Sequence, residues 1–219
     1  MQPDPPRGTI FTFLRFPLTD LKRAEISRQH NMTTQIAQTT KTAKTLLMLG
    51  DSLIEWGDWE SLLPDIPVIN RGIAGEHTED LSARLVNEID AVLDAGTEPQ
   101  YILLMTGTNN LLMGSPYFPV ILGSMLPRLI DLCPSSSITL NSLMPMQIRG
   151  LAPESITAAN NELRGVAKQS GCRFLDMTDP FTEQCLPVTK PCFLNDGVHL
   201  ATRGYQVWAG AIRTHLDAL

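Results

Sequence analysis

From Thr45 to the end of the chain, short apolar runs alternate with longer amphipathic segments. Five runs have the length of buried strands: 45–50, 67–71, 101–106, 137–143 and 173–176. Four other segments have the spacing of amphipathic helices: 78–95, 117–132, 153–170 and 202–217. This alternation is typical of a parallel sheet covered by helices on both faces. We therefore predict a flavodoxin-like, three-layer α/β/α domain around a five-stranded parallel sheet.

The segment 78–95 shows the helical spacing most clearly. Its apolar side chains recur three and four residues apart, which places them on one face of a helix. They are Leu81, Leu85, Ile89, Val92 and Leu93. We expect them to form the apolar face of an amphipathic helix.

Residues 1–44 differ from the rest of the chain. They combine a Pro-rich start with a polar stretch, QIAQTTKTAKT. We interpret them as an N-terminal arm or linker, with Met32 as an alternative start of the chain, and place the folded domain at 45–219. The length of 219 residues and the hydrophobic content of 43% suit a single domain with a substantial core.

Charge and hydropathy exclude two classes of partner. The formal net charge is -6 and basic residues do not cluster, which argues against binding to nucleic acid. No apolar run approaches the roughly 18 residues of a membrane span, and the N-terminus lacks the basic and apolar regions of a signal peptide. We therefore expect a soluble, cytoplasmic protein.

The four cysteines give no sign of a metal site. Cys133, Cys172, Cys185 and Cys192 form no CxxC pair and have no zinc-like spacing with the histidines. In a cytoplasmic protein we expect the thiols to be reduced. Cys185 and Cys192 would be the pair to form a disulfide if the protein were exported.

Sheets of this class bind ligands beyond the carboxyl ends of their strands, so the residues that follow each strand are the candidates for chemistry. Gly50-Asp51-Ser52 follows the first predicted strand. A serine that begins a helix there would expose its hydroxyl at the sheet edge and leave its own N–H unpaired. That position suits a nucleophile, although serine and aspartate are also ordinary helix caps.

The next two strand ends offer hydrogen-bond donors. Gly75, after the second strand, allows a sharp turn that presents a backbone N–H to a ligand. Asn109, after the third strand, can direct its amide toward the same crevice and stabilise an oxyanion. An ordinary glycine turn and an asparagine cap are the alternative interpretations.

Asp196 and His199 precede the last predicted helix. With this spacing, the carboxylate can accept a hydrogen bond from one imidazole nitrogen while the other nitrogen faces outward, as a general base requires. Asp176 and Asp179 compete for the role of the acid, and Asp51 is better explained as a cap.

The other histidines fit less well. His30 lies in the arm, and we expect a solvated surface position for His215. His77 lies close to Gly75, and a surface loop is the favoured interpretation over a place in the crevice.

Four blocks of the sequence resemble the GDSL family of SGNH hydrolases in their order and spacing. They are GDSL at 50–53, NRGIAGEHTEDL at 70–81, GTNN at 107–110 and DGVHLATRGY at 196–205. One residue departs from the family pattern: Asn110 stands where many relatives carry Asp or Glu. The resemblance implies the SGNH hydrolase fold and hydrolysis of esters or thioesters without a metal.

The resemblance also implies a role for each matching residue. Ser52 would be the nucleophile, and Asp196 and His199 would complete a catalytic triad. The N–H groups of Ser52 and Gly75 and the amide of Asn109 would form the oxyanion hole. We expect no cofactor, and a small-molecule, lipid or sugar ester as substrate.

The expected activity is that of a serine esterase or acylhydrolase that forms an acyl-enzyme on Ser52. The sequence has no long insertion that would form a lid, which favours a short acyl group such as acetyl. A thioesterase or lysophospholipase with the same site, and a non-catalytic ligand-binding domain, are the alternatives. Seven residues near the strand ends are candidates for the acyl pocket or for ordinary packing: Trp56, Trp59, Met113, Tyr117, Phe118, Met144 and Met146.

Overall fold

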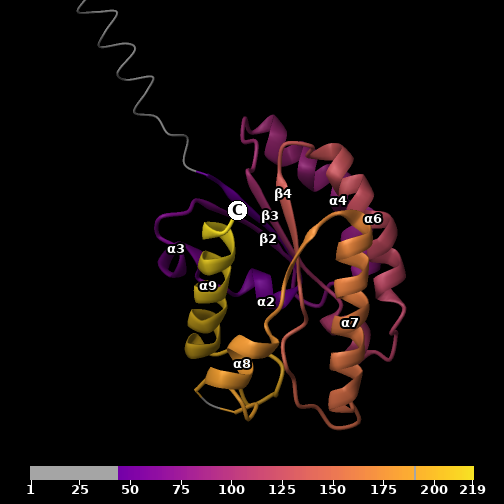
Figure 1. The fold of residues 1–219 in the computed structure, drawn as a ribbon, viewed down its shortest axis with the longest axis vertical. Helices are drawn as coiled ribbons and strands as arrows, with labels where there is room; N and C mark the ends of the chain where they lie inside the picture. The colour runs from indigo at the N-terminus through magenta and orange to yellow at the C-terminus, as the bar shows by residue number, and fades with distance from the viewer. Residues whose placement is uncertain (1–43, 190) are drawn as a thin grey trace, which may run out of the picture. The chain divides into compact units, whose positions relative to one another are not determined.

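The structure is a computed structural model that describes residues 44–189 and 191–219 (Figure 1). The expected N-terminal arm, with Met32 and His30, lies outside these residues apart from Lys44.

Five parallel strands form the sheet at the centre of the described residues. They are β1 (Leu46–Gly50), β2 (Val68–Gly72), β3 (Tyr101–Met105), β4 (Ser137–Asn141) and β5 (Arg173–Leu175). Their spatial order is β2-β1-β3-β4-β5. The order reverses between β1 and β3, which is the point at which flavodoxin-like sheets bind ligands. The predicted α/β fold with a five-stranded parallel sheet is confirmed.

The four predicted helices are present as α4 (Thr78–Asp94), α6 (Phe118–Leu132), α7 (Pro153–Ser170) and α9 (Thr202–Asp217). Four shorter helices lie between them: α2 (Ser52–Glu55), α3 (Trp59–Leu62), α5 (Thr108–Leu112) and α8 (Thr178–Gln184). In Figure 1, α4, α6 and α7 cover one face of the sheet, and α3, α8 and α9 lie on the other. The domain therefore has the three layers that the sequence predicts.

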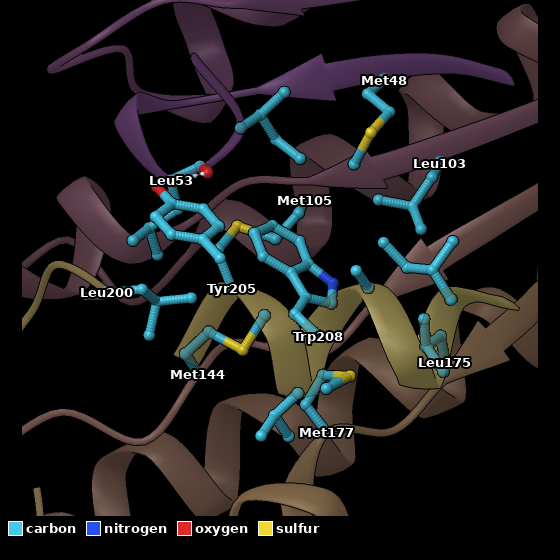
Figure 2. Packing of buried hydrophobic residues seen from close by; sticks show 14 of the residues in the cluster. Met48, Leu53, Leu103, Met105, Met144, Leu175, Met177, Leu200, Tyr205 and Trp208 are labelled. Carbon is cyan, nitrogen blue, oxygen red and sulfur yellow. Dashed lines mark hydrogen bonds between the residues drawn. The ribbon is translucent and has the colours of Figure 1, made fainter. Parts of the chain in front are cut away.

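The alternation of side chains along the strands divides the core into two halves. Leu46 and Met48 of β1 contribute to the half beneath α9, and Leu47 and Leu49 contribute to the half beneath α4 and α6. Figure 2 shows the α9 side, where Trp208 packs among leucine and methionine side chains from the strands. Full burial of such side chains contributes roughly 1.5–3 kcal/mol each.

The apolar face of α4 is narrower than expected. Leu81, Leu85, Ile89 and Val92 are buried, whereas Leu93 is 38% exposed. At 100° per residue, position 93 lies about 120° around the helix from position 81, which turns it away from the sheet. The assignment of Leu93 to the buried face was wrong, because a residue four positions after Ile89 lies at the edge of that face.

The expectation that all four thiols are reduced was also wrong. Cys185 and Cys192 form a disulfide with a Cα–Cα distance of 5.4 Å, and Cys133 and Cys172 are free. The chain returns to the end of α8 after Cys185, so Cys192 comes within disulfide reach. The expectation of reduced thiols rested on a presumed compartment, and the pair that forms is the one that the sequence indicated as the alternative.

No helix among the described residues is long and apolar enough to span a membrane.

Candidate active site

Ser52 is the first residue of α2 and directly follows the turn that ends β1. The turn is tight: a Cβ atom on Gly50 would lie 2.0 Å from the carbonyl oxygen of Met105, so only glycine fits between β1 and β3. Asp51 caps α2, because its Oδ1 accepts a hydrogen bond from the Leu53 N–H at 3.0 Å. Within the described residues, the Ser52 N–H has no acceptor and is free to bind a ligand.

The structure places Ser52, His199 and Asp196 in one hydrogen-bonded chain. The Oγ atom of Ser52 lies 2.9 Å from Nε2 of His199, although the two residues are 147 positions apart in sequence. Nδ1 of His199 lies 2.7 Å from Oδ2 of Asp196. The second carboxylate oxygen, Oδ1, accepts hydrogen bonds from the N–H groups of Val198 and His199, both at 2.9 Å. Asp196 therefore fixes both the backbone turn and the imidazole.

The protonation of Asp196 suits this arrangement. Its burial alone would raise the pKa of its carboxyl group. The hydrogen bonds from the Val198 and His199 N–H groups and from the His199 ring outweigh burial and hold this pKa below the usual value. The carboxylate is thus ionised and acts as a hydrogen-bond acceptor at neutral pH.

The two predicted oxyanion donors come from the loops after β2 and β3. Gly75 has a positive φ of 76°, a conformation that favours glycine, and its N–H has no acceptor among the described residues. The Nδ2 atom of Asn109 donates a hydrogen bond to the carbonyl oxygen of Glu76 at 2.9 Å. Since an amide has two N–H donors, this bond orients Asn109 and leaves one donor for a ligand.

A buried ion pair holds the Gly75 loop, and the sequence analysis missed it. Glu76 is almost fully buried, and its Oε1 lies 2.5 Å from Nε of Arg84. Nη2 of Arg84 donates to Oε2 of Glu76 at 2.8 Å and to the carbonyl oxygen of Arg71 at 2.8 Å. The available signal was an acid eight residues before an arginine that lies on the first turns of a predicted helix.

Asn110 connects α5 to the start of α4. Its Oδ1 accepts from the N–H of Thr78 at 2.9 Å, and its Nδ2 donates to the Glu79 carboxylate at 2.7 Å. An acidic residue at this position could not donate to Glu79 and would repel it. The asparagine at position 110, which differs from the family pattern, therefore supplies the donor that the Glu79 carboxylate needs.

The two competing acids, Asp176 and Asp179, lie at the start of α8. Asp176 pairs with Arg164 and accepts a hydrogen bond from the Thr178 N–H, so it has a structural role at the start of α8. Asp179 lies in α8 beside a groove formed with α9. Asp51 is fully buried, and this burial raises its pKa to about 6. Its Oδ2 has no close hydrogen-bond donor in the described residues, and the Thr108 side chain lies nearby.

His77 and His215 form hydrogen bonds with residues other than Ser52. His77 precedes α4 at the surface, where its N–H donates to Asp80 at 3.3 Å, as expected for a loop histidine. The solvated position expected for His215 was wrong. Its Nε2 lies 3.0 Å from Oγ1 of Thr139, because the last turn of α9 packs on β4. Burial, together with Arg173, lowers the pKa of His215.

Most of the candidate pocket residues belong to the core. Trp59, Phe118, Met144 and Met146 are buried. Three others are exposed: Trp56, Met113 and Tyr117. The indole of Trp56 stacks on the His199 imidazole, with ring centroids 4.1 Å apart and planes inclined by 26°. Sequence reasoning did not anticipate this contact.

The family model that matches the sequence is the GDSL-like Lipase/Acylhydrolase family, over residues 48–207. The chain belongs to this GDSL-like family. The matched range includes Ser52, Gly75, Asn109, Asp196 and His199. No curated protein matches the sequence.

Solved structures share the fold of this GDSL-like protein at low sequence identity. A protein from Streptococcus pneumonia named for platelet activating factor is 24% identical, with a TM-score of 0.67, 90% of this chain covered and 96% of that one. A GDSL-like lipase from Bacteroides thetaiotaomicron is 21% identical, with a TM-score of 0.62 and coverages of 90% and 99%. An acetyl xylan esterase from Geobacillus stearothermophilus is 19% identical, with a TM-score of 0.61 and coverages of 79% and 94%.

Membership of the GDSL-like family assigns the class of reaction. A family of lipases and acylhydrolases cleaves carboxylic esters, so this chain is a carboxylic ester hydrolase that acts on small-molecule esters. The resemblance seen in the four sequence blocks is confirmed.

Proposed function

We propose that the protein is a serine esterase that forms an acyl-enzyme on Ser52. The observation that carries this proposal is the continuous hydrogen-bonded chain from Ser52 Oγ through His199 to Asp196, with distances of 2.9 and 2.7 Å. A serine hydroxyl, a histidine and an oriented carboxylate in this geometry form a charge-stabilised nucleophile and base.

In the first half-reaction, Ser52 Oγ attacks the carbonyl carbon of the ester while Nε2 of His199 takes the hydroxyl proton. Asp196 keeps the ring proton on Nδ1 and stabilises the imidazolium. The carbonyl oxygen becomes an oxyanion that accepts hydrogen bonds from the N–H groups of Ser52 and Gly75 and from the free amide donor of Asn109. The C–O bond to the alcohol then breaks, and His199 gives its proton to the leaving alcohol.

In the second half-reaction, water replaces the alcohol. The water oxygen attacks the acyl carbon while His199 takes a proton from the water. The N–H groups of Ser52 and Gly75 and the amide of Asn109 bind the second oxyanion. The bond to Ser52 Oγ breaks, the serine recovers its proton from His199, and the carboxylic acid leaves. Every proton in this cycle passes through His199.

A short acyl group such as acetyl fits the surroundings of Ser52 best. Phe118, Met144 and Met146 are packed in the interior, where they are not available to line an open groove for a long acyl chain. The exposed candidates, Trp56, Met113 and Tyr117, lie on short connections between helices and not on a long insertion that could cover an acyl chain. One structural neighbour is an acetyl xylan esterase, so acetylated sugars are a substrate class to include in a screen.

The test is hydrolysis of p-nitrophenyl esters from acetate to palmitate by the wild-type protein and the Ser52→Ala variant. Ser61→Ala is the matched control, because Ser61 lies on the exposed surface of α3. We expect the wild type and the control to cleave the short esters and the Ser52→Ala variant to lose this activity. Full turnover by the Ser52→Ala variant would exclude Ser52 as the nucleophile.

The same panel separates the alternatives. A rate maximum at long chains, or with thioesters of the same acyl groups, would replace the short-acyl esterase by a lysophospholipase or a thioesterase. A fluorophosphonate probe should label Ser52 in the folded protein. Absence of both labelling and hydrolysis, including hydrolysis of acetylated sugars, would favour the non-catalytic ligand-binding domain.

A further inference from the structure

The contact between Trp56 and His199 goes beyond the triad. The indole of Trp56 covers one face of the imidazole, at a centroid distance of 4.1 Å and with nearly parallel planes. The side chain of Trp56 is 50% exposed, so burial in the core does not account for its position. His199 is therefore contacted on three sides: by Asp196 at Nδ1, by Ser52 at Nε2 and by Trp56 on its face.

Trp56 ends the same short helix, α2, that Ser52 begins. The two residues are four apart, and the Trp56 N–H donates to the Ser52 carbonyl oxygen at 3.0 Å. Residues four apart on a helix share a face, so both side chains point toward His199. The far end of α2 is held by Asn70, whose Nδ2 donates to the carbonyl oxygens of Ile54 and Glu55 at 3.0 and 3.1 Å. The indole thus has a fixed support.

The stack restrains a motion that the two hydrogen bonds allow. Asp196 and Ser52 hold opposite nitrogens of the ring, so the ring can still tilt about the line that joins those nitrogens. A plane packed against one face opposes this tilt. Alignment of Nε2 with the Ser52 hydroxyl depends on the tilt, because hydrogen bonds weaken steeply with poor angles.

The stack also favours the charged ring that catalysis requires. The face of an indole attracts a cation within about 6 Å of its centre, and the attraction is stronger where water is excluded. Asp196 and His199 are partly open to solvent, with side-chain exposures of 47% and 22%. Trp56 screens one face of this pair from water.

We propose that Trp56 is a positioning residue, whose indole holds the His199 imidazole in the plane needed for proton transfer from Ser52 and stabilises the imidazolium formed in each half-reaction. This inference rests on the proposed roles of Ser52 and His199. It assigns Trp56 a function in turnover that is separate from binding of the substrate.

The kinetic test compares Trp56→Leu, Trp56→Phe and the control Val120→Ala, which changes an exposed apolar side chain on α6. We expect Trp56→Leu to lower kcat roughly 3- to 30-fold, the range of a partly exposed cation–π contact, with KM changed less than twofold. Trp56→Phe keeps an aromatic face and should recover most of kcat, and Val120→Ala should match the wild type. A normal kcat in Trp56→Leu, or a loss confined to KM, would overturn the proposal.

A second measurement is independent of activity. A protonated imidazole in contact with an indole quenches the fluorescence of the indole. The emission of Trp56 is obtained by subtracting the emission of the Trp56→Phe variant from that of the same protein with Trp56. In the Ser52→Ala background, we expect this difference to fall on acidification, and not to fall when His199→Asn is added. Asp51, which also interacts with His199, is present with and without the His199→Asn change, so a pH-dependent change in emission that Asp51 caused would appear in both backgrounds.

The two measurements separate this proposal from the proposed function. Quenching that does not depend on His199 would overturn the stacking itself. His199-dependent quenching with a normal kcat in Trp56→Leu would show a stack without a positioning role, which also overturns the proposal. Turnover that persists in Ser52→Ala would instead overturn the role of Ser52, whatever the fluorescence shows.

Discussion

The side-chain amide of Asn109 donates a hydrogen bond to the backbone carbonyl of Glu76 at 2.9 Å. This bond joins the loop after β3 to the loop after β2, directly beside Gly75. The two loops that supply the proposed oxyanion donors are therefore held to each other as well as to the strands. The same amide group both fixes the loop and keeps one N–H available.

Asn109→Ala should lower kcat roughly 100- to 1000-fold, the typical cost of removing one oxyanion donor. The loss should appear in kcat more than in KM, because the oxyanion exists only after the serine attacks. Asn109 is partly exposed, so the variant should keep its far-ultraviolet circular dichroism. Near-normal turnover by a folded Asn109→Ala variant would remove Asn109 from the oxyanion hole.

Asp51 should make the protein less stable as pH rises from 4 to 7. Burial raises its pKa in the folded state to about 6, above the ordinary value of 3.8 for an aspartate side chain. Between these two values the folded state holds a proton that the unfolded state has released, so stability is full at low pH and is lost as pH rises through about 6. The full shift corresponds to about 3 kcal/mol.

The measurement is urea unfolding of the wild type and Asp51→Asn at several pH values. The amide can still accept from the Leu53 N–H and does not titrate. We expect the difference in unfolding free energy between the variant and the wild type to grow in favour of the variant as pH rises. A difference that is constant from pH 4 to 7 would mean that Asp51 does not titrate with a raised pKa.

The sequence predicts the five strands and the four long helices because each has enough residues to show its period. The four short helices have between four and seven residues, too few for a helical period to be recognised. They form where strand ends turn and where caps such as Asp51 satisfy the first N–H groups. Only the start of α2 at Ser52 was anticipated, from the position of the serine after a strand.

The hydrogen-bonded chain of Ser52, His199 and Asp196 follows from their positions after a strand or before a helix, because these ends meet at one edge of the sheet. The roles of Gly75 and Asn109 as oxyanion donors stay predictions, and the contacts that support the site were not predicted. The Glu76–Arg84 ion pair and the Trp56–His199 stack depend on side chains that meet only when the loops fold. The spacing of four between Ser52 and Trp56 was the sequence signal that could have indicated the stack.

Arg84→Ala should be strongly destabilising. It leaves the carboxylate of Glu76 buried without its partner, which typically costs about 3–5 kcal/mol. The matched control is Arg213→Ala, since Arg213 pairs with the largely exposed Asp65 at 3.1 Å and such pairs contribute about 1 kcal/mol or less. Urea unfolding at constant pH measures both. Equal losses in the two variants would mean that the buried pair has no special role in the loop after β2.

The disulfide should stabilise the segment that leads to Asp196 and His199. Cys192 lies one residue before the antiparallel bridge between Phe193 and Leu200, and this bridge closes the turn that contains both residues. For a loop this short, the chain-entropy model gives roughly 2–3 kcal/mol. We expect a reductant to lower the urea midpoint of the wild type and to leave that of the Cys185→Ser/Cys192→Ser variant unchanged.

Titration of thiols in the unfolded protein tests the bond directly. Protein that is purified and unfolded without reductant should show two reactive thiols, from Cys133 and Cys172, because the other two cysteines are joined. After reduction it should show four. Four thiols before reduction would contradict the disulfide, and the loss of stability expected with reductant should then also be absent, because both results depend on the same covalent bond.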